Sequence, residues 1–459
     1  MIVMKFGGTS VQDAAAINRV AEIVLGRVDR APVVVVSALA RVTEALLRVA
    51  DDARARRVEE AAAGIRELLE RHLATSRELL ENSQESLLAV ERELQSQFAE
   101  LDNLARSVAT LGELTARSKD AIVSFGERLS SVMIAEAFRL RGIKAQLVDS
   151  REFIITDDHF TRAAPDMPET NRRARTALEP IIKSGRVPVA QGFIGSTLEG
   201  VTTTIGRGGS DYSAALIGAA LGAEAIEIWT DVDGLMTADP RVVRDARRIR
   251  IISFAEASEL SYFGAKVLHP STVLPAVEQG IPVHIYNTHN PTCEGTEIVA
   301  TPHPSRNLIK SIAFKRGVTI VNVASTRMLM AYGFLRTIFE VFDRHQTSVD
   351  VVTTSEVSVS MTLDNTDRLD AIGRDLSGIG EVSVERDKAI VCVVGDNLKF
   401  TPGVAARLFQ AIENTNVNMI SQGASEINLT FVIDESDADR VVRRLHDVFL
   451  TDVDPAVFA

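Results

Sequence analysis

Short runs of β-branched residues alternate with helical patterns along the first 300 residues, and no other feature restricts the fold as strongly. The run "APVVVVSALA" has the composition of a strand that is buried on both faces of a sheet. "VPVAQGFIG", "AIEIWTDVDGL" and "IPVHIYN" are further short apolar strands, and helical patterns separate them. Strands that alternate with helices are joined by right-handed crossovers. We therefore predict an α/β fold with a mainly parallel central sheet and helices on both faces.

A charged, helix-forming stretch interrupts this alternation between about residues 51 and 116. Apolar residues recur in it every seven positions, at Leu87, Leu94, Leu101 and Val108. A stripe of this kind predicts an α-hairpin that packs on a neighbouring surface. We interpret the stretch as a structural insertion.

The chain after about residue 307 contains an internal repeat. The segment that starts at Gly333 matches the segment that starts at Gly403, an offset of 403 − 333 = 70 residues that also pairs Ser355 with Ser425. Each copy has the pattern of a strand, a helix, a two-stranded hairpin and a second helix. Two copies of one small α+β unit are therefore predicted.

The net charge and the cysteine content of the chain indicate which binding partners and which cellular compartment to expect. The net charge of −12 repels nucleic acid and anionic lipid, so we expect neither nucleic acid nor a membrane as a partner. The two cysteines, Cys293 and Cys392, are far apart, which suits a reducing compartment. The chain begins with a strand-like run and not with a targeting segment, so we expect a cytoplasmic protein. The eight histidines show no ligand spacing, and no metal site of the protein's own is predicted.

A turn near the start of the chain, "KFGGTS" at residues 5–10, combines the parts of an anion site. Glycines let the backbone approach a ligand, and free N–H groups at the start of a helix attract anions. Lys5 adds a mobile positive charge, so a phosphoryl group would suit the turn. Taken alone, a tight turn that merely needs glycine explains the stretch equally well.

A second glycine-rich turn lies in "TTTIGRGGSDYSAALIGAALG", residues 202–222. Arg207 stands among three glycines and offers a planar group that fits a carboxylate bidentately. Ser210 and Asp211 follow, and both are suitable residues for capping the helix that begins there. An arginine among three glycines indicates a binding function.

Two further stretches contribute candidates. "WTDVDGLMTADPR", residues 229–241, follows a strand of the buried type, and α/β sheets bind ligands at the carboxyl ends of their strands. "FGAKVLHP", residues 263–270, supplies Lys266, while we interpret His269 as a core or turn histidine.

Together these motifs resemble the amino acid kinase family, and specifically the aspartate kinases. "KFGGTSV", "SFGERLS", "GRGGSDYSA", "TDVDGLMTADPR" and "ELSYFGAKVLHP" occur in the order of that family, and the resemblance runs through essentially the whole chain. The tandem repeat resembles the pair of ACT domains that regulate these enzymes. The insertion, and the absence of a fused dehydrogenase, resemble the monofunctional, lysine-sensitive type. The resemblance implies a catalytic domain at 1–300 and ACT domains at 308–386 and 387–459.

The resemblance also implies a reaction. The γ-phosphoryl group of MgATP would pass to the side-chain carboxylate of L-aspartate, which is the first step of lysine, methionine and threonine biosynthesis. The cofactors would be ATP and Mg²⁺, and L-lysine would be the feedback inhibitor. Pairing of ACT domains across chains would give a homodimer or a dimer of dimers. A carboxylate nucleophile is already ionised at neutral pH, so the reaction needs no general base.

Site residues follow from the same resemblance, position by position. The catalytic residues would be Lys5, Gly7, Gly8 and Asp211. The aspartate pocket would consist of Thr43, Glu127, Arg207, Gly208, Gly209 and Ser210. In that pocket Arg207 would bind the α-carboxylate and Glu127 would face the ammonium. The ATP site would consist of Lys5, Phe6, Gly7, Gly8, Thr9, Ser10, Thr230, Asp231, Met236, Arg241, Lys266 and Val267. The L-lysine site would consist of Met328, Phe334, Leu335, Ser348, Val349, Asp350, Thr354 and Ser355, with Asp350 taking the effector's ammonium.

Three positions depart from the family pattern. Arg41 stands where glycine is usual, which puts the shape of its loop in question. Met236 replaces a tyrosine that often contacts the nucleotide, and Ala331 replaces a serine that is common near the effector site. The change at Ala331 weakens the assignment of lysine. Threonine, or a combination of amino acids, is an alternative effector, because relatives that these amino acids inhibit share the ACT layout.

Two other functions stay open. A kinase of glutamate or N-acetylglutamate is disfavoured by the long insertion and by the ACT pair. A catalytically inactive amino-acid sensor is disfavoured by the presence of Lys5, Arg207, Asp231 and Lys266.

Overall fold

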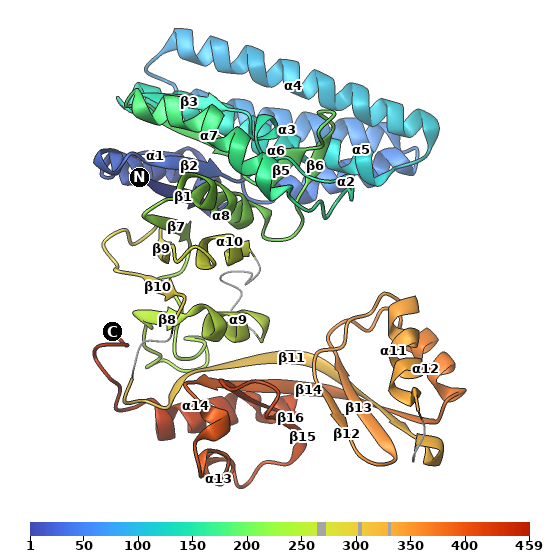
Figure 1. Ribbon diagram of the computed structural model, residues 1–459. Helices are drawn as coiled ribbons and strands as arrows, with labels where there is room; N and C mark the ends of the chain where they lie inside the picture. Colours follow the sequence, from blue (N-terminus) through green and yellow to red (C-terminus); the bar gives the residue numbers. More distant parts are fainter. Residues whose placement is uncertain (264–271, 302–304, 329–331) are drawn as a thin grey trace. The chain divides into compact units, whose positions relative to one another are not determined.

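The computed structural model describes residues 1–263, 272–301, 305–328 and 332–459 (Figure 1). The chain forms two compact units, Met1–Leu235 with Val267–Thr301 and Met236–Lys266 with Pro302–Ala459. The segment Met236–Lys266 thus belongs to the second unit, whereas the sequence analysis places it in the catalytic domain. The predicted domain boundaries stay a prediction. Among the described helices, none combines the length and the apolar composition needed to cross a membrane.

The first unit is built on the parallel sheet that the alternating pattern predicts. Seven strands lie in the order β3 (Ala145–Val148), β4 (Val187–Gln191), β2 (Val33–Val36), β1 (Ile2–Phe6), β7 (Ala225–Thr230), β9 (Val283–Asn287) and β10 (Thr296–Val299). All neighbouring pairs are parallel except β9 and β10. The four valines of β2 are all buried, as the β-branched run indicates.

Helices cover both faces of this sheet. Helices α1 (Ala14–Leu25) and α6 (Phe125–Leu140) contact each other and share a core with Ile2, Met4 and Phe6 of β1. Side chains alternate along a strand, so Val3 lies on the other face, where it is also buried. Helix α8 (Gly209–Leu221) contacts β1 and also α7 (Met167–Lys183). Lys5 is two residues beyond Val3 and therefore shares its face.

The interrupting stretch forms the predicted helical hairpin. Helix α2 (Val42–Arg54) leads into α3 (Val58–Leu79) and α4 (Gln84–Leu111), which contact each other and α2 (Figure 1). Leu94, Leu101 and Val108 of the heptad stripe are buried, whereas Leu111, at the end of α4, is 73% exposed. Helix α5 (Ala116–Val123) follows. The short strands β5 (Ile194–Ser196) and β6 (Thr202–Thr204) pair with each other, and α10 (Leu274–Val277) precedes β9.

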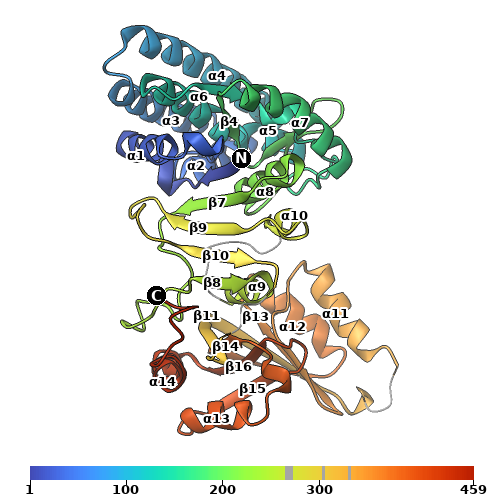
Figure 2. The ribbon, with the colours of Figure 1, turned by 60° about the vertical axis from the view of Figure 1, so that its left-hand side comes forward.

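The second unit contains a six-stranded antiparallel sheet. Its order is β12 (Val352–Thr354), β13 (Ser358–Leu363), β11 (Ile309–Ala324), β14 (Glu381–Gly395), β16 (Asn428–Asp434) and β15 (Val417–Gln422). Strands β11 and β14 are long and pair with each other along most of their length (Figure 2). Strand β8 (Ile251–Ser253) and helix α9 (Phe254–Tyr262) also belong to this unit.

The predicted repeat is confirmed in the local structure of the second unit. Helices α11 (Phe334–Arg344) and α13 (Val404–Ala411) begin after Gly333 and Gly403, whose φ angles are 79° and 82°. Such angles favour glycine, and they explain why both copies start with it. Each helix is followed by a two-stranded hairpin and then by α12 (Leu369–Ser377) or α14 (Ala438–Phe449). The predicted boundary between residues 386 and 387 falls inside β14, which both copies share.

Candidate active site

Two turns at the carboxyl ends of β1 and β2 form one wall of the candidate site. The chain leaves β1 through Gly7 and Gly8 into a short 3-10 helix, Thr9–Val11. The amide of Ala40, in the turn after β2, donates to the carbonyl of Gly8 at 3.1 Å. A Cβ atom on Gly8 would come within 3.1 Å of the Ala38 carbonyl, so the close approach of the two turns favours glycine. Gly8 thus serves the packing of the turns as well as any ligand.

A third turn precedes α8 and carries the second glycine motif. Gly206 and Gly208 have φ angles of 81° and 71°, and Gly208 is the residue that begins the helix. The expectation that Ser210 or Asp211 caps α8 is wrong, because no side chain accepts a hydrogen bond from the first turn. Both residues lie inside the helix, since glycine already provides the left-handed conformation at the cap.

Asp211 instead forms an ion pair with Lys5. The Lys5 Nζ atom lies 2.6 Å from Asp211 Oδ1, and each side chain is 11% exposed. A lysine side chain is flexible, and a partly buried carboxylate at this distance holds its ammonium in one place. Asp211 is therefore suited to orienting Lys5 at the end of β1.

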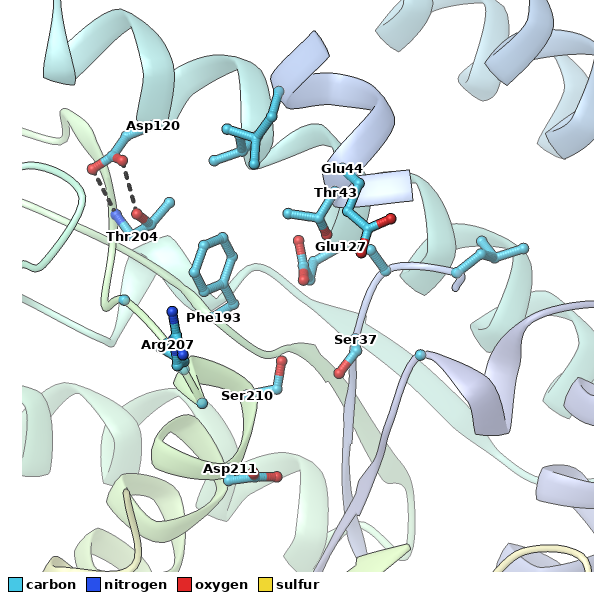
Figure 3. Close-up of a pocket in the computed structure, with 18 of the residues that line it drawn as sticks. Ser37, Thr43, Glu44, Asp120, Glu127, Phe193, Thr204, Arg207, Ser210 and Asp211 are labelled. Atoms are coloured by element: carbon cyan, nitrogen blue, oxygen red, sulfur yellow. Dashed lines mark hydrogen bonds between the residues drawn. The ribbon is translucent and has the colours of Figure 1, made fainter. Parts of the chain in front are cut away.

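The three turns line a cavity of about 660 Å³ in the first unit (Figure 3). All residues predicted for the aspartate pocket lie at its surface: Thr43, Glu127, Arg207, Gly208, Gly209 and Ser210. Lys5, Gly8 and Asp211 of the predicted catalytic set also line it, and Gly7 does not. Figure 3 shows Thr43, Glu127 and Ser210 turned toward a common space, with Arg207 at its side. The structure thus brings together residues from β1, α2, α6 and α8.

The electrostatics of the cavity depend above all on a buried acid, Glu127, and an exposed cationic group, Arg207. Glu127, in the first turn of α6, is 3% exposed, and its Oε2 atom makes no hydrogen bond to any described residue. Burial raises the pKa of its carboxyl to about 8, an effect that a backbone hydrogen bond from Ala38 partly offsets. Arg207 is exposed and forms no ion pair within the described part of the chain. A ligand with one ammonium and one or more carboxylates would satisfy both groups.

The sequence analysis missed several lining residues, among them Ser37, Lys119, Asp120 and Phe193. Ser37 directly follows β2, so the rule that α/β sheets bind ligands at the carboxyl ends of strands could have identified it. Asp120 is buried and accepts hydrogen bonds from Thr161 N at 2.8 Å, Thr204 N at 2.9 Å and Thr204 Oγ1 at 2.8 Å. Those partners are 41 and 84 residues away in sequence, so no local sequence pattern predicts these hydrogen bonds.

Two of the residues predicted for the ATP site have structural roles at the first turn. The side chain of Phe6 is fully buried and stacks on Trp229 with ring centroids 6.0 Å apart. Ser10 is buried and donates to the Trp229 carbonyl at 3.3 Å, whereas Thr9 is exposed. Contact of Phe6 with a nucleotide would therefore use its backbone only.

The remaining residues of the predicted ATP site lie in different units. Thr230 and Asp231 follow β7 in the first unit, and the Thr230 hydroxyl donates to Asp231 at 3.2 Å. Met236 and Arg241 belong to the second unit, where Arg241 donates to both carboxylate oxygens of Asp239. Lys266 and Val267, together with His269, lie outside the described residues. The grouping of these residues stays a prediction.

The predicted effector residues all belong to the second unit. Met328, Phe334 and Val349 pack against the apolar core of the first ACT-type copy, which favours core packing for Phe334. The side chain of Leu335 is 41% exposed. Ser348, Thr354 and Ser355 are exposed as well, and Ala331 lies outside the described residues.

Asp350, the predicted acceptor of the effector's ammonium, already has partners within the chain. Its side chain is 3% exposed and accepts hydrogen bonds from Tyr262 Oη at 2.8 Å and from Lys315 Nζ at 3.3 Å. The ammonium of Lys315 therefore occupies the position that an amino-acid effector would need at this carboxylate.

Comparisons with known proteins complete the description of the site. Residues 1–287 match the amino acid kinase family, and residues 391–449 match an ACT domain. The chain is 40% identical to "Lysine-sensitive aspartokinase 3" of Escherichia coli (strain K12), over 97% of this chain and 98% of that protein. Two crystal structures of E. coli aspartokinase III each cover 98% of this chain at 38% identity. The complex with aspartate and ADP (R-state) has a TM-score of 0.83 and covers 100% of that chain. The complex with lysine and aspartate (T-state) has a TM-score of 0.85 and covers 99% of that chain.

Proposed function

The chain belongs to the amino acid kinase family, and we propose that it is an aspartate kinase, which transfers the γ-phosphoryl group of MgATP to the side-chain carboxylate of L-aspartate. The products are ADP and 4-phospho-L-aspartate. The proposal rests on the similarity to E. coli aspartokinases along nearly the whole chain and on the charges of the cavity in the first unit.

The buried carboxyl group of Glu127, whose Oε2 atom has no hydrogen bond to a described residue, lies in the same cavity as Arg207, and this observation carries the proposal. An isolated buried acid is unfavourable unless a cation or a proton compensates it. The α-ammonium of L-aspartate compensates Glu127, and its α-carboxylate pairs with Arg207. The side-chain carboxylate then points toward Lys5. N-acetylglutamate has no ammonium, so it leaves Glu127 without a partner.

Phosphoryl transfer depends mainly on alignment and on compensation of the negative charge that spreads over the moving oxygens. Lys5 provides that compensation, and Asp211 holds it in position through the 2.6 Å ion pair. The amide of Gly8 and the turn that follows it receive the phosphoryl group, whereas the amide of Gly7 donates to the Trp229 carbonyl at 3.1 Å. The attacking carboxylate is ionised at neutral pH, so no general base takes part.

Mg²⁺ enters as part of the nucleotide substrate. Magnesium usually keeps several waters and binds through phosphate oxygens with at most one or two carboxylates. Thr230, Asp231, Met236, Arg241, Lys266 and Val267 are the residues that we assign to the nucleotide.

L-Lysine is the effector, and it binds in the second unit between two copies of the chain. Helix α11 supports this assignment, because Leu335 and Phe339 on its surface are 41% and 38% exposed. Residues four apart lie on the same face of a helix, so these two side chains form one exposed apolar surface, and contiguous apolar surfaces are where partners bind. A symmetric pairing of this kind gives a homodimer, or a dimer of dimers, in the cytoplasm.

The test is a coupled assay of ADP release with MgATP and L-aspartate, in which hydroxylamine traps the acyl phosphate. Turnover that millimolar L-lysine suppresses would support both the reaction and the effector. Turnover with L-glutamate or N-acetylglutamate but not with L-aspartate would show that L-aspartate is not the substrate. Absence of turnover with all three, and no difference between the parent and Lys5→Ala, would favour an amino-acid sensor.

A further inference from the structure

Arg71, in the helical hairpin, contacts both turns that form the wall of the cavity. Its Nη1 atom donates to the carbonyl of Ala40 at 2.8 Å, and its Nη2 atom donates to the carbonyl of Gln12 at 3.1 Å. Ala40 ends the turn after β2, and Gln12 ends the glycine turn after β1. One guanidinium therefore connects two segments that are 28 residues apart in sequence (40 − 12).

We propose that Arg71 is a positioning residue for phosphoryl transfer, and that the helical insertion serves catalysis through it. The inference rests on the proposed kinase function. Arg71 does not line the cavity, so it acts on the substrate only through the turns that it holds. These turns carry Lys5, Gly7 and Gly8 on one side and Ser37 and Ala38 on the other.

The chemistry of the contact favours arginine at this position. A guanidinium is planar and presents two N–H donors in fixed directions, so it can hold two carbonyls at a set separation, which a lysine ammonium does less well. No carboxylate in the described part of the chain forms an ion pair with Arg71, so both hydrogen bonds go to backbone acceptors. Hydrogen bonds in which the donor is charged are stronger than neutral ones.

The turns have few other direct connections, which makes the guanidinium bridge important. Ser37 N donates to the Phe6 carbonyl at 3.2 Å, and Ala40 N donates to the Gly8 carbonyl at 3.1 Å. The first bond directly follows the strands, and the second connects Ala40 to Gly8. Arg71 adds the connection between Ala40 and Gln12, at the outer end of the first turn. Helix α3, which carries Arg71, is held in turn by contacts with α1, α2, α4 and α6. The hairpin thus provides a rigid support for the phosphate-binding turn.

The experiment compares Arg71→Ala and Arg71→Lys with Arg66→Ala, a matched control on the same helix. Arg66 is exposed and has no hydrogen bond or ion pair with any described residue. We expect kcat to fall about 10- to 100-fold in Arg71→Ala, since small misplacements of catalytic groups have effects of this size. The KM for L-aspartate should change less than kcat, because Arg207 lies in the turn before α8, which Arg71 does not contact. Arg71→Lys should lie between the parent and Arg71→Ala.

Two further measurements separate positioning from a general loss of stability. Guanidinium at ~20 mM, far below denaturing concentrations, should restore part of the kcat of Arg71→Ala and none of that of Lys5→Ala. Hydrogen exchange of peptides covering residues 7–12 and 37–41 should be about tenfold faster in Arg71→Ala than in Arg66→Ala. Equal kcat and equal exchange in the two alanine variants would overturn the inference, as would a loss of kcat without faster exchange or rescue. If the parent does not phosphorylate L-aspartate, the proposed function fails, and the exchange rates alone decide whether Arg71 holds the turns.

Discussion

Lys5 is fixed by a carboxylate from another element, and this contact defines what the residue can do. Its ammonium lies 2.6 Å from Asp211, and both side chains are largely shielded from water. Lys5→Met should therefore lower kcat by a hundredfold or more, because the loss of one preorganised charge at a transition state costs about 3 kcal/mol. The assay is ADP release at saturating MgATP and L-aspartate. The control is Lys144→Met, which changes an exposed lysine. Equal activity of the two variants would show that Lys5 takes no part in the mechanism.

The buried carboxyl of Glu127 predicts a pH dependence of substrate binding. Burial raises its pKa to about 8, so the group is mainly protonated in the empty cavity at neutral pH. The ammonium of L-aspartate pairs only with the ionised form, and that form increases as the pH rises toward 8. We expect kcat/KM for L-aspartate to rise from about pH 6, to reach half of its maximum near pH 8 and to level off above about pH 9.

Glu127→Gln is the control for this pH dependence. The amide does not titrate, so the rise in kcat/KM should disappear and the KM for L-aspartate should increase. A profile that keeps the same slope in Glu127→Gln would assign the dependence to another group.

At the scale of elements, the start of α2 explains how the chain tolerates arginine in place of the family's usual glycine. Arg41 has φ 67° and ψ 0°, which is the left-handed conformation that glycine adopts easily. The shape of the loop is therefore accessible to arginine at a cost of about 1 kcal/mol. Arg41→Gly should relieve this strain and raise the Tm by roughly 1–2 °C, after the greater flexibility of glycine in the unfolded chain is subtracted.

A matched substitution inside the same helix should have the opposite effect. Arg48 is exposed in the middle of α2, where glycine is unfavourable by about 1 kcal/mol. Arg48→Gly should therefore lower the Tm by a few degrees in differential scanning calorimetry. A lower Tm in both variants would show that Arg41 makes stabilising contacts that outweigh its backbone strain.

Local sequence patterns predicted most of the helices and strands. The features that they did not predict depend on contacts between residues that are distant in sequence. The β-branched run of β2, the heptad stripe of α4 and the glycines before α11 and α13 each depend on neighbouring residues, and the structure has them as predicted. The hydrogen bonds of Asp120 and Arg71 depend on which segments meet in space, and a single sequence contains no such information. The misassigned cap of α8 has a different origin, because Gly208 and Ser210 are both good capping residues and the turn geometry decides between them.

At the scale of the whole molecule, the family motifs predicted the class of reaction. They did not predict equally well which of the site residues lie together in space. The order of five motifs along the chain identified the family, and the match to residues 1–287 confirms it. The residues of the aspartate pocket lie in one unit and line one cavity. The predicted nucleotide residues are divided between the two units, so their grouping depends on an arrangement that sequence patterns do not encode.

The regulatory half of the molecule supplies the last prediction, which concerns competition at Asp350. Lys315 lies 3.3 Å from Asp350 and 2.6 Å from Asp364, so its ammonium has a second carboxylate available when an effector arrives. L-Lysine would have to displace Lys315 from Asp350, and this displacement weakens effector binding. Lys315→Ala should therefore lower the L-lysine concentration for half-inhibition about tenfold, which corresponds to about 1.4 kcal/mol for one charged hydrogen bond.

Inhibition curves at fixed MgATP and L-aspartate measure this shift, with Arg336→Ala as the control. Arg336 is 82% exposed and, among the residues that the structure describes, pairs only with Glu340 on the same helix, so its removal should leave half-inhibition unchanged. Tyr262→Phe removes the other hydrogen bond to Asp350 and should shift the curve in the same direction by a smaller amount. An unchanged L-lysine concentration for half-inhibition in Lys315→Ala would show that the effector's ammonium does not bind at Asp350. The exposed polar residues Ser348, Thr354 and Ser355 would then be the remaining candidates for contact with the effector.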